Sequence, residues 1–207
     1  MIIEGRAPAD VNSLASILTG NGSAAHAQKL FRRRGFFRVG MDEIADAAGV
    51  TKRTLYYHFD SKDALLTAVL ASQHERTFAD FQNYGIDLSG GADALIDKLF
   101  EGLVKWSSKP RWAGSGFTRL AIELADLSGH PARSIAREHK VLMEQQLETL
   151  LAEAKVPAPK ARARELALLI EGAMVMILIH GDRSYCTAAA EAAKRLVAGS
   201  DSSPPMS

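Results

Sequence analysis

Apolar residues recur at every third or fourth position along most of the chain, and this spacing limits its fold more than any other feature. The spacing is seen, for example, in Leu95, Leu99 and Leu103, and it gathers apolar side chains on one face of an α-helix. Strand signals are few, because Val, Ile and Thr rarely alternate with polar residues and no Asn-Gly or Asp-Gly hairpin lies between alternating segments. The sequence therefore predicts an all-α fold.

Clusters of glycine, proline and serine divide this pattern into separate helices. Asp60 is expected to cap a helix that runs through Leu70, with Asp63 at its third position. Pro131 suits the first turn of a long helix that runs to about Lys155. The helices expected after position 60 span residues 61–70, 92–107, 117–127, 131–155, 160–180 and 185–198.

The composition is that of a globular chain that can bury a core without covalent help. Of 207 residues, 47% are hydrophobic and 24% are charged. The single cysteine, Cys186, excludes an internal disulfide framework and is typical of a reducing compartment. The apolar run from Leu166 to Ile179 is interrupted by Glu171 and is too short to cross a bilayer, and the N-terminus carries no secretion signal. We therefore expect a cytoplasmic protein without a membrane segment.

Charge is unevenly distributed, although the net charge of the whole chain is only +1. Residues 23–62 contain eight basic and four acidic residues, whereas the rest of the chain contains 17 basic and 20 acidic residues. Three of the basic residues are consecutive, Arg32, Arg33 and Arg34, and they either form a solvated helix end or contact phosphates. The asymmetry predicts a basic module for a polyanion joined to a neutral or acidic body.

Residues 41–59, MDEIADAAGVTKRTLYYHF, predict two short helices around Gly49. In the first helix, Ile44 and Ala48 share one face, and the small alanines let a second helix approach closely. Gly49 supplies the positive φ that a tight turn between helices commonly needs. Thr51 can cap the second helix. This arrangement is typical of a helix-turn-helix.

The second helix, residues 51–59, is expected to bury Leu55 and Phe59 through their four-residue spacing. Its outward positions carry cationic, hydroxyl and phenol groups, which can reach base edges in a major groove while the helix N-terminus favours a phosphate nearby. These positions are Lys52, Arg53, Thr54, Tyr56 and His58. Lys62 follows in the next helix, where it either contacts another phosphate or is solvated near Asp63.

The stretch KLFRRRGF followed by MDEIADAAGVTKRTLYYHFDSKDALLTAVL resembles the TetR family of bacterial transcriptional regulators over residues 26–70. The resemblance implies an N-terminal three-helix, helix-turn-helix DNA-binding domain and a larger C-terminal helical domain that binds an effector and dimerises. It further implies a homodimer on DNA, usually a repressor that a small ligand releases.

Carried over position by position, the resemblance makes Lys52, Arg53 and Thr54 the base-reading or groove-proximal residues. It places Thr51, Tyr56, His58 and Lys62 on phosphates and leaves Tyr57 to pack. Arg53 stands where many relatives have glycine, and a guanidinium there can read guanine through O6 and N7.

A second departure from the family lies upstream, where residues 19–23 read TGNGS instead of a basic helix start. The first helix is then expected to begin near Ser23 or Ala24, unless Val11 to Leu18 forms a separate helical turn. We accordingly expect an N-terminal arm over residues 1–22, the DNA-binding domain over 23–70, the effector-binding and dimerisation domain over 71–198, and a disordered tail over 199–207.

The sequence of the C-terminal domain contains no recognisable motif, so only its composition indicates a function. Aromatic and methionine side chains there either form ordinary core or line a cavity for a hydrophobic or aromatic effector. The candidates are Phe100, Trp106, Trp112, Phe117, Met143 and Met174. Helices 132–155 and 160–180 resemble in position the pair that forms the four-helix dimer interface of the family. A broad apolar surface with small residues agrees with this role. Its residues are Leu166, Leu169, Ile170, Ala173, Met174 and Ile177.

No catalytic arrangement is found in the sequence. Ser115 lacks the glycine spacing of a nucleophile elbow, no phosphate-binding glycine motif occurs, and the histidines show no metal-ligand spacing. We therefore expect no enzyme, no cofactor and no metal. The expected function is a regulator that binds a palindromic operator in double-stranded DNA as a homodimer, and the alternative is a helical small-molecule binding protein with impaired DNA binding.

Overall fold

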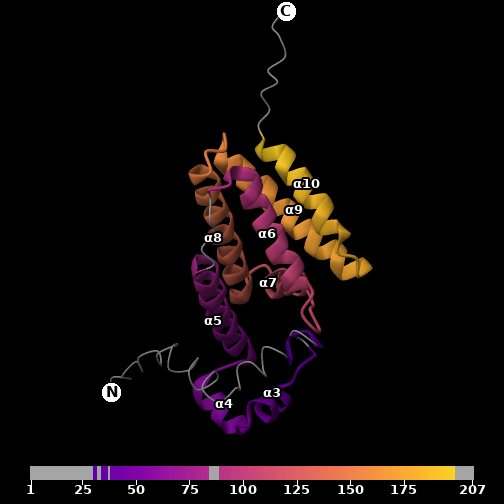
Figure 1. The fold of residues 1–207 in the computed structure, drawn as a ribbon. Helices are drawn as coiled ribbons and strands as arrows, with labels where there is room; N and C mark the ends of the chain where they lie inside the picture. Colours follow the sequence, from indigo (N-terminus) through magenta and orange to yellow (C-terminus); the bar gives the residue numbers. More distant parts are fainter. Residues whose placement is uncertain (1–29, 32–33, 37, 84–88, 199–207) are drawn as a thin grey trace, which may run out of the picture. The chain divides into compact units, whose positions relative to one another are not determined.

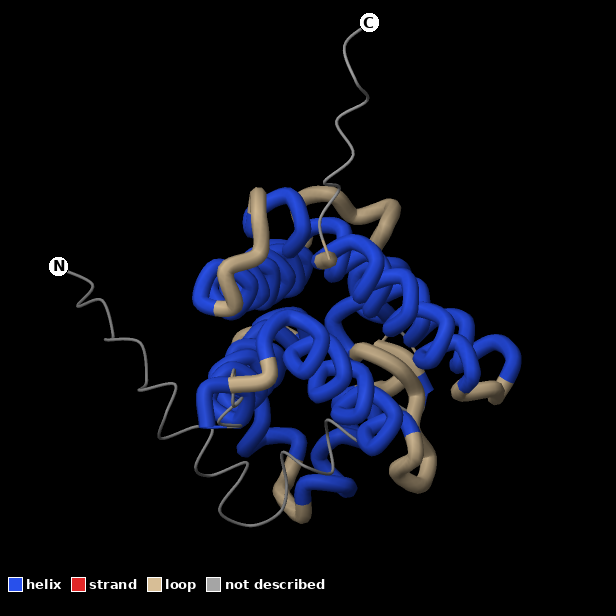
Figure 2. The backbone as a smooth tube through the Cα atoms, turned by 45° about the horizontal axis from the view of Figure 1, so that its top comes forward, coloured by secondary structure: helices blue, strands red, loops and turns tan. Residues whose placement is uncertain are grey.

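The computed structural model describes residues 30–31, 34–36, 38–83 and 89–198. All of the regular structure in these ranges is helical (Figure 2), as the sequence predicts. The labelled helices are α3 (Met41–Ala48), α4 (Lys52–His58), α5 (Lys62–Asn83), α6 (Gly91–Ser107), α7 (Gly116–Glu123), α8 (Pro131–Glu153), α9 (Pro159–His180) and α10 (Ser184–Val197). Among the described residues, no helix is both long enough and apolar enough to span a membrane. The expected arm over residues 1–22, the start of the first helix and the tail over 199–207 lie outside the described residues.

The chain forms two compact units, each assembled from two stretches of sequence. Of the described residues, those within 30–81 and 116–137 form the first unit, and those within 82–115 and 138–198 form the second. Helices α3, α4 and α7 belong to the first unit, and α6, α9 and α10 belong to the second. Helix α8 contributes its first residues, 131–137, to the first unit and the remainder to the second.

Two apolar clusters hold the first unit together. The cluster under the helix-turn-helix consists of Val39, Met41, Ile44, Ala45, Leu55, Phe59, Leu65 and Val69. The other joins α5 to α7 and the start of α8 and consists of Phe36, Leu66, Leu70, Phe117, Leu120, Leu124, Ala132 and Ala136. Because Leu65 and Leu66 are neighbours in α5 but belong to different clusters, α5 serves both cores.

The second unit is built around α9, which packs beside α10 and α6 (Figure 1). Its core contains the most deeply buried side chains of these helices, among them Leu95, Ile96, Leu151 and Leu166. Cys186 lies in the same core, where burial raises the pKa of its thiol. This one cluster spans all the helices of the second unit, so their packing forms a single core.

The predicted helix boundaries agree with the structure for the four long helices of the second half of the chain. Helices α6, α8, α9 and α10 each begin and end within about two residues of the expected positions. The helix expected to end at Leu70 instead continues to Asn83 as α5, because no glycine or proline interrupts residues 71–83. Helix α7 ends at Glu123 rather than at residue 127, and the chain continues in tight turns in which Ala125 N–H donates to Ile122 O.

The expected cap of α5 is wrong, and so is the expected surface position of four of the six apolar residues on α9. Ser61, not Asp60, caps α5, because its Oγ accepts from the N–H of Ala64 at 3.0 Å. On α9, the expected surface residues Leu166, Ala173, Met174 and Ile177 are buried in the core of their own unit. Leu169 and Ile170 are partly buried against the same core. The exposed apolar side chains of α9 are Leu168, Val175, Leu178 and Ile179.

Candidate DNA-binding surface

The turn between α3 and α4 has the geometry that residues 41–59 predict. Ile44, Ala45 and Ala48 are buried on the inner face of α3. Gly49 ends α3 in the left-handed region with φ of 65°, where a side chain would be strained. The N–H of Val50 then donates to Ala45 O at 3.0 Å. This hydrogen bond and the left-handed Gly49 end α3, and the chain continues directly into α4.

Thr51 fixes the start of α4. Its backbone is extended, with φ of −81° and ψ of 153°, and its Oγ1 accepts from the N–H of Thr54 at 3.1 Å. The two threonine hydroxyl oxygens are 2.8 Å apart. Thr51 is therefore the N-cap, as predicted, and the hydroxyls of both threonines lie at the N-terminus of α4.

Helix α4 separates one buried face from one exposed face. Leu55 is buried in α4, and Phe59, which follows the helix, is buried beside it. Thr51, Lys52, Arg53 and Tyr56 are exposed, and Thr54 and His58 are partly exposed. Six of the seven predicted DNA-binding residues thus lie within residues 51–58 with side chains that are exposed or partly exposed.

Tyr57 was expected to pack, and this prediction is wrong. Its side chain is 65% exposed, and its ring and that of His58 meet edge to face at a centroid distance of 5.0 Å. The reason is the helical register, because Leu55 and Phe59 occupy the inner face and position 57 falls on the opposite side. Tyr57 therefore belongs to the exposed face of α4.

Two carboxylates of α3 bind cationic side chains within residues 23–62. Lys52 Nζ donates to Asp42 Oδ2 at 2.9 Å, and this hydrogen bond raises the pKa of the Lys52 ammonium. Arg34 forms an ion pair with Glu43. Sequence reasoning missed both acids, because Asp42 and Lys52 are ten residues apart and meet only through the turn at Gly49. Arg32 and Arg33 lie outside the described residues.

Lys62 differs from the other predicted DNA-binding residues. It is partly buried, with Nζ 4.3 Å from the ring centroid of Phe36, and burial lowers the pKa of its ammonium. A cation over an aromatic face is attracted to the ring electrons. Lys62 thus packs against the core of the first unit, and its contact with a phosphate stays a prediction.

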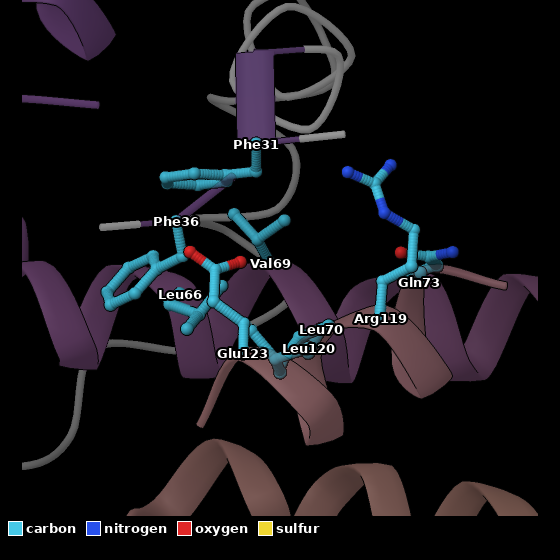
Figure 3. A pocket seen from close by; sticks show the side chains of 10 residues that line it. Phe31, Phe36, Leu66, Val69, Leu70, Gln73, Arg119, Leu120 and Glu123 are labelled. Atoms are coloured by element: carbon cyan, nitrogen blue, oxygen red, sulfur yellow. The ribbon is translucent and has the colours of Figure 1, made fainter. Parts of the chain in front are cut away.

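A small pocket in the first unit lies between Phe31, Phe36, α5 and α7 (Figure 3). Its floor is apolar, with Leu66, Val69 and Leu120, and its cavity volume is about 50 Å³. A cavity of that volume holds one or two water molecules. It is much smaller than a site for a drug-sized ligand. None of the predicted effector-lining residues lines this pocket.

The predicted effector-lining residues are divided between the two units. Phe117 is buried in the first unit, whereas Phe100 and Met174 are buried in the core of the second. Met143 is partly buried in α8. Trp106 and Trp112 meet edge to face at a centroid distance of 5.5 Å. Nε1 of Trp112 is buried without a hydrogen-bond partner among the described residues. A ligand role for these side chains stays a prediction.

The capped helix with a polar outer face, joined to α3 by a tight turn, defines a helix-turn-helix protein. The model for bacterial regulatory proteins of the tetR family matches residues 25–69. The HTH-type transcriptional repressor KstR2 of Rhodococcus jostii is 31% identical over 80 residues, which cover 37% of this chain and 39% of KstR2. The HTH-type transcriptional activator FasR of Mycolicibacterium smegmatis is 57% identical over 44 residues, which cover 21% of this chain and 20% of FasR.

Solved structures extend the similarity to most of the chain. A TetR-family transcriptional regulator from Streptomyces coelicolor aligns with a TM-score of 0.76 at 24% identity, covering 88% of this chain and 95% of the other. A putative regulator of the same family from Streptomyces avermitilis aligns with a TM-score of 0.67 at 28% identity, covering 83% and 96%. The family model covers residues 25–69, and over the rest of the chain the similarity to these solved structures is one of fold. The relatives named here are transcriptional regulators, not enzymes, and the chain matches 20–39% of the length of the two curated ones.

Proposed function

We propose that this chain is a transcriptional regulator that binds a near-palindromic operator as a homodimer. The exposed face of α4, with Lys52, Arg53 and Tyr56 on a helix that is capped at Thr51 and anchored by Leu55, carries this proposal. One such helix reads few base pairs, whereas two helices related by a twofold axis can enter successive major grooves roughly 34 to 36 Å apart. The protein acts in the cytoplasm, where bacterial DNA lies.

The exposed apolar face of α9 supports the homodimer. Leu168, Val175 and Ile179 recur at intervals of seven and four residues, so they form one stripe along the helix. The side chains of Leu168 and Ile179 are 69% and 66% exposed. A contiguous apolar stripe in water is typical of a protein interface, and a twofold axis would bring the same stripe of a second copy against it.

The regulator represses transcription until an effector binds in the second unit. The supporting observation is Trp112, whose buried indole N–H has no acceptor among the described residues, beside an aromatic partner in Trp106. Buried donors are nearly always paired, so a hydrophobic or aromatic ligand with one acceptor atom would supply the acceptor that this N–H lacks. Release requires that the effector bind more tightly to the state with the wrong spacing of the two α4 helices.

Selection of bound fragments from random double-stranded DNA by the purified protein tests the proposal. We expect a palindromic sequence, bound with an affinity that falls steeply as salt rises. Arg53→Ala should then relax the preference at one base pair, at a cost of about 1 to 3 kcal/mol. No enriched sequence from a folded dimer would contradict the proposal, and ligand binding without DNA affinity would support a helical small-molecule binding protein with impaired DNA binding.

A further inference from the structure

Helix α4 begins with two cations and no acid of its own. Lys52 and Arg53 occupy its first turn, and that turn contains no acidic residue. The N-terminus of a helix carries partial positive charge, so cations there are disfavoured and a carboxylate nearby is favoured. Asp42 supplies this carboxylate from α3, with Oδ2 at 2.9 Å from Lys52 Nζ.

The Asp42 carboxylate accepts its hydrogen bond from a long, flexible side chain. A lysine side chain has a flexible stem of four carbons and a compact ammonium that can bind any phosphate within reach. Its hydrogen bond to Asp42 keeps the ammonium beside the start of α4. Both side chains are exposed, at 50% for Lys52 and 73% for Asp42, so the pair adds little to the stability of the fold.

We propose that Asp42 is a positioning residue for sequence recognition, which holds the Lys52 ammonium at the start of α4 and away from sequence-independent phosphate contacts. The inference rests on the proposed DNA-binding function and concerns how its specificity arises. Phosphates are present in every duplex, whereas base edges distinguish the operator. A lysine that is held in place contributes to operator recognition, and a lysine that is released contributes equally to every duplex.

The chain provides a matched control for this proposal. Asp46 lies one turn further along α3 and is also exposed, and no contact of its carboxylate with Lys52 is found in the structure. Asp42→Asn and Asp46→Asn remove the same charge from the same helix. Only the first removes a carboxylate that pairs with the Lys52 ammonium.

The experiment measures the affinity of both variants for the selected operator and for a random duplex of equal length, at several salt concentrations. For Asp42→Asn we expect tighter binding to the random duplex. The affinity for that duplex should also fall more steeply with salt, by about one unit of slope per α4 helix. The ratio of operator affinity to random affinity should fall roughly threefold to tenfold. Asp46→Asn should leave this ratio unchanged. Asp42→Glu, which keeps a carboxylate, should restore most of it.

A double-mutant cycle separates positioning from simple charge. In a Lys52→Gln background, Asp42→Asn should no longer change the ratio, because there is no ammonium to release. Equal effects of Asp42→Asn and Asp46→Asn would overturn the proposal, and so would an effect of Asp42→Asn that persists in the Lys52→Gln background. The failure of the DNA-binding function itself would be seen separately, as wild-type protein that prefers no sequence.

Discussion

Helices α4 and α9 show two different relations between sequence and surface. In α4 the buried side chain is Leu55 and the opposite face is cationic or aromatic, so the pattern of polarity identifies the outer face. In α9 both faces are apolar, because Leu166 and Ile177 are buried by the chain itself while Leu168 and Ile179 are exposed. Polarity thus predicts a surface only where the two faces of a helix differ.

The largest expected effect comes from the small core under the helix-turn-helix. Leu55→Ala should lower the free energy of unfolding by about 2 to 5 kcal/mol, because Leu55 is 2% exposed and its methyl groups leave a cavity. Urea unfolding measures this loss. Leu151→Ala, in the core of the second unit, should cost a similar amount.

The two leucine variants should differ in DNA binding, which sharpens the comparison between the units. At temperatures where both variants remain mostly folded, Leu55→Ala should weaken operator binding more than Leu151→Ala does, because Leu55 anchors α4 directly. Equal losses of operator affinity would show that recognition does not depend on the local packing of α4.

The second prediction concerns the exposed face of α9. Leu168→Glu should raise the dimer dissociation constant at least roughly 100-fold, because burial of a leucine contributes about 1.5 to 3 kcal/mol and a twofold interface contains it twice. Sedimentation at several concentrations measures the constant. Ile122→Glu is the control, since Ile122 is 68% exposed but lies on α7. If Ile122→Glu dissociates the dimer and Leu168→Glu does not, α9 is not the interface.

Much of the helix-turn-helix was predictable because each of its positions has a single geometric requirement. Gly49 must adopt a positive φ, Thr51 must accept a hydrogen bond from the N–H of Thr54, and Leu55 must meet the inner face of α3. The pairing of Asp42 with Lys52 was not predictable, because it joins residues ten apart through a turn. The same limit explains α9, whose buried face depends on how α6 and α10 pack against it.

The third prediction tests the turn at Gly49. Gly49→Ala should destabilise the protein by about 1 to 2 kcal/mol, because an L side chain is strained at φ of 65°. The added Cβ would meet nothing within 4 Å, so strain and not collision is the cause. Gly49→Asn should lose less, since asparagine tolerates the left-handed region. Thermal unfolding measures both variants, and an equal loss for the two would contradict this cause.

The smallest expected effect compares two helix caps of the first unit. Thr51→Ala and Ser61→Ala each remove a hydroxyl that accepts a backbone N–H, at 3.1 Å and 3.0 Å, and each should cost about 1 kcal/mol in urea unfolding. The two variants should differ in operator affinity, because Thr51 caps the short α4 and Ser61 caps the long α5. Thr51→Ala should weaken operator binding, and Thr51→Ser should restore it.

Since asparagine also caps a helix, Thr51→Asn separates the cap from a direct phosphate contact of the hydroxyl. Full operator affinity in Thr51→Asn would indicate that Thr51 acts by fixing the start of α4, and equal losses in Thr51→Ala and Ser61→Ala would show that α4 has no special dependence on its cap.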